Sequence, residues 1–442
     1  MLLMENSITY HVSNLVNNIF YELTNLETNT SSIIKINCEK LSRNGELSFL
    51  INRQVWKDYV PNGSDNNLTS NNILDYYVKN KNAIENCSTF DEIVQKAFNL
   101  IELKSHEWSL QINSFSLQKE RLCLFLNRPQ ALSLAIKNAL NNGLSYGQKA
   151  LVDESFTFKI QIDNEAELSN QRLNFLKDFF QRILQLQGYK IITEKNHNNY
   201  ILTTKSEGIV EENYKKIVCG VVKNSENNSK EKSITWNSYL SSKKEQLKKL
   251  NAHKYQNKDN GEDDDENIKQ IATTAVKFEF LSVKPSRSVV LKKFDTSDDT
   301  LKEAAFILYN TARIKAILNK YEEKVLAGKY PKLLNVDNID FLCLSQEEEW
   351  ELVFNYILQY PEMIQGCVKH KPTLEACPQY ICSFLSKLCQ HFSIYYRRSR
   401  VLVDGYSHLM PTVMARIYLL QSILIVLENS LSIFGITPMS KM

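Results

Sequence analysis

The chain has 442 residues, of which 43% are hydrophobic and 23% charged, a balance typical of a globular protein with two or three domains. Its formal net charge of +3 excludes a protein that coats nucleic acid by bulk charge, but it allows a local basic patch. The nine cysteines form no Cys-x-x-Cys pair, so we expect buried core thiols in a reducing compartment, with no metal site and no cofactor.

The start of the chain has no features of a secretory signal, because Glu5 comes early and no small-residue cleavage site follows before Phe20. The longest apolar run, Ile417–Leu427, is shorter than the roughly 20 residues that cross a bilayer. These patterns predict a cytoplasmic protein.

Residues 1–150 mix helical and extended patterns and predict an N-terminal α/β domain. The apolar run Arg121–Leu126 is typical of a buried strand. A helix is expected from Pro129 to Leu140, since proline suits the first helical turn. The asparagine-rich stretch Pro61–Asn72 indicates a solvated loop.

Residues 151–296 begin with a pattern of strand, helix and strand. Alternating apolar residues predict a strand over Phe156–Ile162, and spacings of three and four predict a helix over Ser169–Leu186. Gly188 suits the end of that helix, and a second strand is expected at Tyr189–Ile192. This order favours a βαβ unit with a parallel sheet.

A polar insertion interrupts this domain at about residues 223–270. It is rich in Asn, Ser, Lys and Glu, so we expect it to be largely disordered, with one helix over Trp236–Leu250. The acidic cluster Glu262–Glu266 is interpreted as solvated surface rather than a metal site. Order is expected to resume at Ala272.

Residues 297–442 have helical periodicity throughout and predict a bundle. The first helix should end at Gly328. Three more helices are expected, at Glu347–Leu358, Tyr380–Leu402 and Pro411–Phe434.

Four segments of this bundle follow one another in the order seen in a known domain: Leu308–Ile314, Tyr395–Leu402, Met414–Ile417 and Phe434–Ile436. Their succession resembles the DALR anticodon-binding domain that closes class I arginyl-tRNA synthetases. Earlier segments also fall in synthetase order. Arg121–Gly147 is similar to the end of the N-terminal domain, and Phe156 to Tyr189 to the start of the nucleotide-binding fold.

Two further segments flank the expected position of the second catalytic loop. Cys219–Val222 resembles the segment that enters it, and Ala272–Ser282 the strand and turn that leave it. The resemblance implies a multidomain α/β plus all-α fold. Its parts would be a mixed N-terminal domain, a reduced Rossmann-like βαβ remnant of a class I synthetase, and a C-terminal DALR-type helical bundle.

The catalytic motifs of such a synthetase are missing from the sequence. Glu167–Asn170 stands where the resemblance expects His-x-Gly-His, and Glu167 would repel a triphosphate. Lys223–Lys230 stands where Lys-Met-Ser-Lys-Ser is expected. Residues 193–218 are also too few to build the amino-acid pocket. We therefore expect a protein that resembles the enzyme but is not one.

Candidate tRNA-binding residues are cationic or aromatic side chains of the bundle. Because residues 297–442 hold 15 Lys/Arg and 15 Asp/Glu, any attraction for RNA must come from clustering. Basic residues with interleaved rings suit phosphates and unpaired bases, although a solvated basic face with core tyrosines gives the same pattern. Arg416 could equally hold the bundle together through Glu428 or a helix end. The candidates are Tyr309, Arg313, Lys320, Lys387, Tyr395, Tyr396, Arg397, Arg398, Arg400, Arg416 and Met442.

Four segments look more like DALR-domain proteins outside the synthetases than like any synthetase: Val276–Ser282, Leu308–Arg313, Gly328–Pro331 and Glu349–Leu352. This resemblance implies an adaptor that recognises arginine tRNAs and presents them to a methyltransferase forming 3-methylcytidine in the anticodon loop. Two alternatives stay open. One is a residual enzyme acting on nucleotides or tRNA, and the other is a protein–protein assembly factor.

Overall fold

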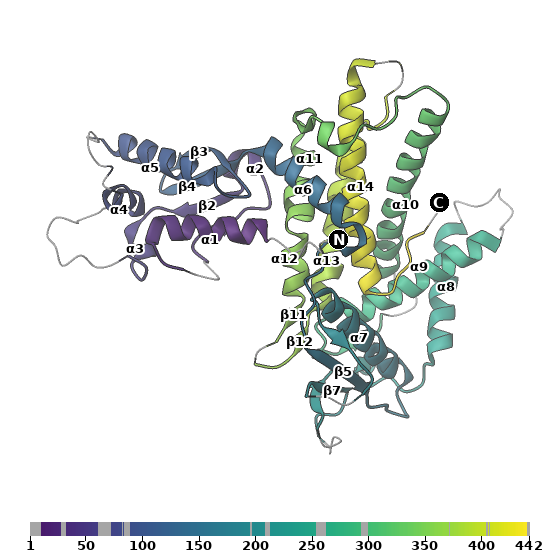
Figure 1. Cartoon of the computed structure of the whole chain (residues 1–442). Helices are drawn as coiled ribbons and strands as arrows, with labels where there is room; N and C mark the ends of the chain where they lie inside the picture. Colours follow the sequence, from purple (N-terminus) through teal and green to yellow (C-terminus); the bar gives the residue numbers. More distant parts are fainter. Residues whose placement is uncertain are drawn as a thin grey trace. The chain divides into compact units, whose positions relative to one another are not determined.

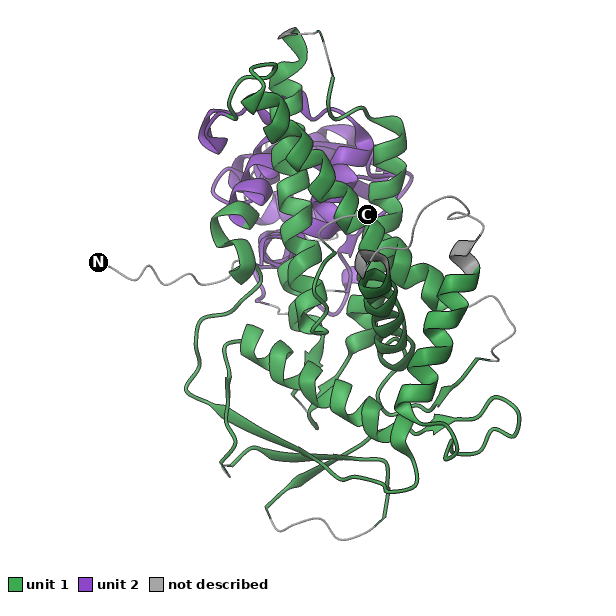
Figure 2. Cartoon of the chain, turned by 90° about the vertical axis from the view of Figure 1, so that its right-hand side faces the viewer, with its two compact units in different colours: residues 1–8, 139–333, 360–442 green, residues 9–138, 334–359 purple. Residues whose placement is uncertain are grey.

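The computed structural model describes residues 10–27, 32–60, 72–81, 83, 89–194, 197–207, 213–252, 262–292, 299–370, 372–403, 405 and 407–439. The chain forms two compact units, coloured separately in Figure 2. Unit 1 comprises residues 1–8, 139–333 and 360–442, and unit 2 comprises residues 9–138 and 334–359. This division differs from the three predicted domains. Residues 334–359, expected in the C-terminal bundle, belong to unit 2.

Unit 2 is built on an antiparallel sheet whose strand order is β1-β2-β4-β3. The strands are β1 (Lys35–Ile36), β2 (Leu47–Leu50), β3 (Ile112–Gln118) and β4 (Arg121–Leu126). The predicted strand at 121–126 is confirmed, as is the helix that follows it. The helices are α1 (His11–Thr24), α2 (Leu41–Asn44), α3 (Arg53–Trp56), α4 (Ile73–Asn80), α5 (Phe90–Ser105) and α6 (Arg128–Asn142), whose end enters unit 1.

The later segment of unit 2 is largely irregular before it becomes helical. It contains two 3₁₀ turns, Val336–Asn338 and Phe341–Cys343, followed by α11 (Glu347–Leu352) and a π-helical turn, Val353–Leu358. The expected continuous helix over 347–358 is therefore split. Trp350 is 1% exposed and packs within unit 2, so the segment contributes to the core there.

The α/β part of unit 1 contains the predicted βαβ unit. Strand β5 (Ser155–Ile160) leads into α7 (Glu167–Leu186), and β6 (Lys190–Ile191) then pairs with β5 in parallel. Strands β7 (Asn199–Thr203) and β8 (Lys215–Val218) extend a wholly parallel sheet of order β6-β5-β7-β8. Phe158 stacks on Phe180 of α7 at 5.2 Å, which explains the apolar alternation in β5.

The polar insertion is ordered over most of its described residues, contrary to the prediction. The expected helix is present as α8 (Trp236–Ala252), but α9 (Glu262–Leu281) occupies the acidic cluster and the segment expected to be a strand after Ala272. Buried Lys243 of α8 lies 3.0 Å from Glu279 of α9. Tyr239 also donates a hydrogen bond of 2.7 Å to Glu279. The two helices thus fold as a hairpin held by a buried polar cluster.

The remaining helices of unit 1 form the bundle that Figure 1 shows in green and yellow. They are α10 (Asp299–Leu326), α12 (Tyr360–Gly366), α13 (Pro378–Arg398) and α14 (Met410–Ile433), with short turns at Gly143–Ser145 and Ser407–Leu409. Two short strand pairs accompany them, β9 (Val222–Lys223) with β10 (Val289–Val290) and β11 (Val368–Lys369) with β12 (Glu375–Ala376). Helix α13 ends at Arg398, four residues earlier than predicted, and β11 and β12 interrupt a region expected to be wholly helical.

Helix α14 is long and apolar enough to cross a membrane by length and composition alone. Of its most apolar stretch, 56% is buried inside the fold. The short run Ile417–Leu427 noted in the sequence is therefore part of a longer apolar helix. In the described structure α14 packs against α7, α10 and α13, which is the position of a core helix.

The α/β part and the bundle are joined at the end of α14. Lys277 of α9 donates to the carbonyl oxygens of Phe434 and Gly435, each at 2.9 Å. Arg182 of α7 donates to the Ser432 carbonyl at 3.1 Å. Because the last carbonyls of a helix lack partners inside it, these two cations cap α14 and fix it to the α/β part.

Candidate nucleic-acid interface

Helices α10 and α13 bring two of the candidate residues, Arg313 and Tyr396, together. The guanidinium carbon of Arg313 on α10 lies 5.0 Å from the ring centroid of Tyr396 on α13. Arg313 also donates to the Asn310 side chain at 3.0 Å, which orients it over the ring. Tyr396 remains 41% exposed. The pair presents an accessible aromatic ring directly beside a cation.

Three further arginines follow this ring at the end of α13. Arg397 and Arg398 occupy its last turn, and Arg400 lies two residues beyond its end. All three are exposed. Arg397 donates to the Ser393 carbonyl at 3.2 Å, as expected for a cation at a helix C-terminus. The site therefore combines clustered positive charge with an exposed ring.

The prediction for Tyr395 is wrong, because its side chain is fully buried. It packs beside Phe392, with ring centroids 6.5 Å apart. Adjacent helical residues point about 100° apart, so only one of the two neighbouring tyrosines can face solvent here. Tyr395 is a core residue, and Tyr396 alone supplies the exposed ring. The apolar stripe of α13 is buried as predicted: Ile381, Leu385, Leu388 and Phe392.

Arg416 helps to position the end of α13. It donates to the Arg400 carbonyl at 3.0 Å, whereas Glu428, the carboxylate proposed as its partner, lies 2.7 Å from Lys315. Of the two interpretations left open, the structure supports contact with the backbone just beyond a helix end. Arg416 thereby orders the segment that carries Arg400.

The other candidates have different surroundings. Lys320 and Lys387 are exposed on α10 and α13, and Tyr309 is half-buried on α10. Met442 lies outside the described residues. The cluster defined by Arg313, Tyr396, Arg397, Arg398 and Arg400 is called the α13 basic cluster below.

A pocket of about 380 Å³ lies between α10 and α14 and was not predicted from the sequence. Its walls are mainly apolar, and Leu326 at its edge is 88% exposed. Tyr321 donates to the Pro331 carbonyl at 3.1 Å, which holds the turn after α10 against the pocket. The lining residues are Leu318, Tyr321, Glu322, Val325, Leu326, Lys332, Leu333, Ile417 and Gln421.

Lysines surround the end of α10 beside this pocket. Lys320, Lys329 and Lys332 are exposed, and the Lys324 ammonium lies 4.9 Å from the Tyr330 ring centroid. Gly328, with φ of +69°, allows the chain to turn after the helix. The Gly-Lys-Tyr-Pro segment was the only sequence signal for this feature. This pocket could hold an unstacked base between its apolar walls, with the Gln421 amide beside the base and the nearby lysine ammonium groups beside its phosphate.

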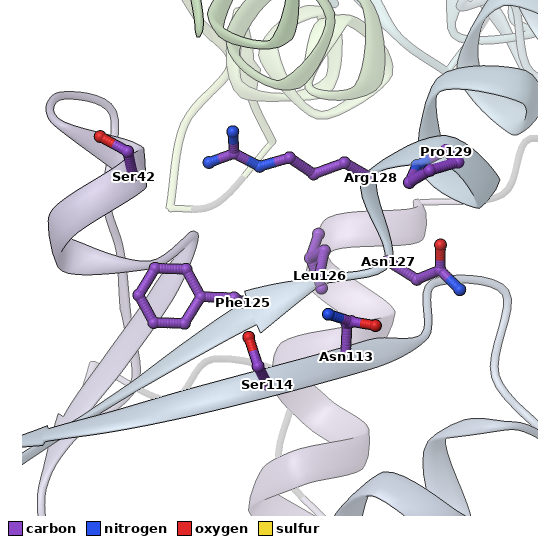
Figure 3. A pocket seen from close by; sticks show the side chains of 8 residues that line it. All are labelled: Ser42, Asn113, Ser114, Phe125, Leu126, Asn127, Arg128 and Pro129. Carbon is purple, nitrogen blue, oxygen red and sulfur yellow. The ribbon is translucent and has the colours of Figure 1, made fainter. Parts of the chain in front are cut away.

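Unit 2 carries a separate pocket of about 520 Å³ at the ends of β3 and β4 (Figure 3). Phe125 is half-buried, whereas Asn113 and Ser114 are exposed on the neighbouring strand. Figure 3 shows the Arg128 side chain extending from the start of α6 toward Ser42. The lining residues are Ser42, Asn113, Ser114, Phe125, Leu126, Asn127, Arg128 and Pro129.

Arg128 is fixed by a polar cluster within unit 2. Its guanidinium donates to Glu347 at 2.7 Å and to Glu46 at 3.2 Å, and it lies 5.4 Å from the Trp350 ring centroid. Trp350 donates to Glu46 at 2.7 Å. Burial raises the pKa of Glu46, although these donors and the Leu126 amide oppose the shift. The cluster attaches residues 334–359 to the sheet and positions Arg128 at the pocket.

No group of three or more His, Cys, Asp or Glu side chains that could hold a metal occurs among the described residues. The eight cysteines that the structure describes are free thiols. Burial raises the pKa of Cys219 to about 12, so this thiol is protonated at neutral pH.

Comparison with known proteins identifies the bundle and the fold. Residues 307–442 match the family model of the DALR anticodon binding domain. The DALR anticodon-binding domain-containing protein 3 of Rattus norvegicus is 30% identical over 174 residues, or 38% of this chain and 32% of the relative. The chain thus spans about a third of the length of that curated relative.

Two arginyl-tRNA synthetases extend the comparison. The arginine–tRNA ligase of Borreliella burgdorferi is 29% identical over 184 residues, which are 42% of this chain and 29% of that enzyme. The solved structure of the Thermus thermophilus arginyl-tRNA synthetase covers 98% of this chain and 100% of its own, with a TM-score of 0.59 and 9% identity. At that identity the likeness concerns the fold alone. The chain therefore has the arginyl-tRNA synthetase fold, and its residues 307–442 are similar to the DALR anticodon binding domain.

Proposed function

We propose that this protein is a non-catalytic tRNA-binding adaptor whose DALR domain recognises the anticodon stem-loop of arginine tRNAs. The observation that carries this proposal is the α13 basic cluster, which lies inside the matched residues 307–442. There the exposed Tyr396 ring stands beside Arg313 and is followed by three exposed arginines. Single-stranded RNA loops are bound by stacking on aromatic rings combined with phosphate contacts, and this cluster offers both.

Each of the two pockets is a further candidate for binding a nucleotide. The pocket between α10 and α14 would take an unstacked base, because Gln421 offers an amide and Lys332 an ammonium beside apolar walls. In unit 2, Phe125 offers a ring, and the amides of Asn113 and Asn127 can pair with base edges. We propose that this second pocket binds a nucleotide outside the anticodon stem-loop.

The absence of aminoacylation is part of the proposal. The sequence contains no His-x-Gly-His motif, and Glu167 stands in the first turn of α7, where a class I synthetase is expected to bind ATP. A carboxylate at a helix N-terminus competes with phosphate for the same backbone donors. The similarity to DALR anticodon-binding domain-containing protein 3 also favours a role outside the synthetases.

The proposed partner is a methyltransferase that forms 3-methylcytidine in the anticodon loop. It is supported by the resemblance of four segments to DALR-domain proteins outside the synthetases: Val276–Ser282, Leu308–Arg313, Gly328–Pro331 and Glu349–Leu352. We propose the cytoplasm as the location, and the free thiols of the described cysteines support this.

Replacing Arg397, Arg398 and Arg400 together by Ala should weaken tRNA binding by at least about tenfold, since charge-assisted hydrogen bonds each contribute about 1.5–3 kcal/mol. Filter binding with purified arginine tRNAs and with a non-cognate tRNA measures both affinity and selectivity. The bundle should stay folded, because all three side chains are exposed.

A matched control removes the same charge from α8, a different helix of unit 1, where Lys248 and Lys249 are exposed and Lys244 is half-buried. Lys244→Ala, Lys248→Ala and Lys249→Ala on α8 should leave binding nearly unchanged. Equal losses in the two triple variants would mean that bulk charge, not the α13 basic cluster, binds RNA. Recovery of RNA without arginine isoacceptors after crosslinking in cells would overturn the proposed selectivity. Partner capture that survives ribonuclease would support an assembly factor instead.

A further inference from the structure

Open α/β sheets bind nucleotides in a crevice beyond the carboxyl ends of their strands. The crevice lies where the strand order reverses. In unit 1 that point is between β5 and β7, because β6 lies on one side of β5 and β7 and β8 lie on the other. The loop after β5 and the first turns of α7 border this crevice. The residues there determine what the sheet can bind.

Arg172, in the second turn of α7, is completely buried. Its guanidinium donates to the carbonyl oxygens of Gly220 and Arg287, at 2.6 and 2.7 Å, and to that of Phe280 at 3.0 Å. Two longer hydrogen bonds reach the carbonyls of Lys284 and Val283, at 3.3 and 3.5 Å. A guanidinium has five N–H donors, so every donor of Arg172 has an acceptor within the chain. No donor is left for a phosphate.

The carbonyl cradle depends on close approach of two backbone segments. A Cβ atom on Gly220 would lie 2.2 Å from the carbonyl carbon of Arg287, so only glycine fits. The Gly220 amide donates to the Pro285 carbonyl at 2.8 Å. One turn earlier on α7, Ser169 accepts a hydrogen bond of 3.0 Å from the Val222 amide. Residues 220–222 and 280–287 therefore cover the start of α7.

The loop between β5 and α7 is closed by two ion pairs with the segment that follows β9. Lys230 binds Asp163, whose side chain is 12% exposed, and Lys232 binds Glu165. The Lys230 contact lowers the pKa of Asp163. Asn170 holds the same loop by bonding both the amide and the carbonyl of Asp163, at 2.8 and 2.7 Å. These carboxylates and the lysines paired with them therefore line the loop after β5, which borders the crevice.

We infer that side chains of this protein fill the crevice where related sheets bind a nucleotide. Arg172 occupies a cradle of backbone carbonyls, which acts as an intramolecular guanidinium site. Residues 223–232 close the carboxyl ends of the strands. Unit 1 is then completed by its own side chains and needs no nucleotide to fold or to bind RNA. RNA binding by unit 1 rests on the proposed function, whereas the filling of the crevice is independent of it.

Thermal unfolding of the full chain tests the filled crevice directly. A ligand that binds the folded state raises Tm, so Mg-ATP should leave the wild-type Tm unchanged. A saturable rise in Tm with Mg-ATP would overturn the inference. In the same preparation, tRNA affinity should be equal with and without Mg-ATP. If tRNA fails to bind at all, the proposed function fails while the Tm result still decides the state of the crevice.

The guanidinium site is tested by chemical rescue. Arg172→Ala should lower Tm by several degrees, and methylguanidinium, at concentrations that do not denature the wild type, should restore part of the loss. Arg182→Ala serves as the control. Arg182 is only partly buried and donates to the Ser432 carbonyl, so no closed cavity would retain the added ion. Equal rescue of both variants, or an Arg172→Ala variant as stable as wild type, would contradict the site.

A second variant covers the case in which Arg172→Ala does not fold. Arg172→Lys keeps the charge but offers three donors to the five carbonyls. It should unfold at a lower temperature than wild type, and hydrogen exchange should accelerate at the Gly220 and Val222 amides. Unchanged exchange at these amides would show that the guanidinium does not hold the cradle together.

Discussion

At the scale of single residues, the difference between Tyr395 and Tyr396 separates packing from a candidate role in binding. Tyr395 is fully buried in the bundle, whereas Tyr396 is 41% exposed and lies beside Arg313. The cation restricts the ring, so less side-chain entropy remains to be lost when a base stacks on it. A ring held in this way is a better stacking platform than a freely rotating one.

Tyr396→Ala should therefore weaken tRNA binding by about 1–3 kcal/mol, or on the order of 5- to 150-fold, the usual loss when a stacking ring is removed. Tyr396→Phe keeps the ring and should retain most of the affinity. Titration of a fluorescently labelled anticodon stem-loop measures both variants. If Phe and Ala lower the affinity equally, the hydroxyl rather than the ring makes the contact.

At the scale of secondary-structure elements, the α8–α9 hairpin shows how a polar segment can be ordered. The side chains of Lys243 and Glu279 are 3% and 4% exposed, and Tyr239 adds a hydrogen bond to the same carboxylate. Removal of one partner would leave an uncompensated buried charge, which is more damaging than removal of both. The hairpin should therefore depend on the pair as a unit.

Lys243→Met alone should lower the free energy of unfolding by about 3–5 kcal/mol, because Glu279 would stay buried without its cation. Adding Glu279→Gln should recover much of that loss, since Gln can still accept from Tyr239. Urea denaturation, with hydrogen exchange over α8, measures both. Lys248→Met breaks the exposed pair with Asp265 and should change stability little. A similar loss for the Lys243 and Lys248 single variants would argue against a buried pair.

Several elements were predictable because their burial imposes a strict period on the sequence. Phe156 and Phe158 alternate in β5 because both are buried, Phe158 against Phe180 of α7 and Phe156 against Tyr189. The stripe from Ile381 to Phe392 marks the buried face of α13. Helix α9 was missed because its first turns are acidic, while its buried contacts come later, at Ile271 and Ala275. Composition averaged over the segment concealed those positions.

The candidate site was only partly predictable for a related reason. A cluster of arginines after Tyr396 is evident in the sequence, but the meeting of Arg313 with that ring depends on how α10 packs against α13. The pocket between α10 and α14 joins residues almost 100 positions apart, from Leu318 to Ile417. No local pattern encodes such a contact.

At the scale of the whole molecule, a net charge of +3 leaves little general attraction for RNA. Binding must then rely on a few local phosphate contacts. Each contact releases counterions, so log affinity should fall by about 0.7–0.9 per contact for each tenfold rise in salt.

Wild-type protein should therefore show a steep salt dependence, and the variant without Arg397, Arg398 and Arg400 a shallower one, reduced by about 0.7–0.9 for each phosphate that is no longer neutralised. Affinities measured by filter binding across a salt series give both slopes. Parallel slopes for the two proteins would place the phosphate contacts elsewhere. Tyr396→Ala is the useful comparison here, since removal of an uncharged ring should lower affinity without altering the slope.

Because residues 334–359 are part of unit 2, few fragments of this protein can be expressed without breaking a core. Residues up to Leu333 and from Tyr360 onward belong to unit 1, and the residues between them belong to unit 2. In unit 2, Trp350 donates a hydrogen bond to Glu46, and Glu347 accepts one from Arg128. A fragment cloned from residue 297 onward would carry a tryptophan deprived of its pocket and a glutamate deprived of its arginine. Experiments on the matched residues 307–442 should therefore keep the full chain, with all the residues of unit 2.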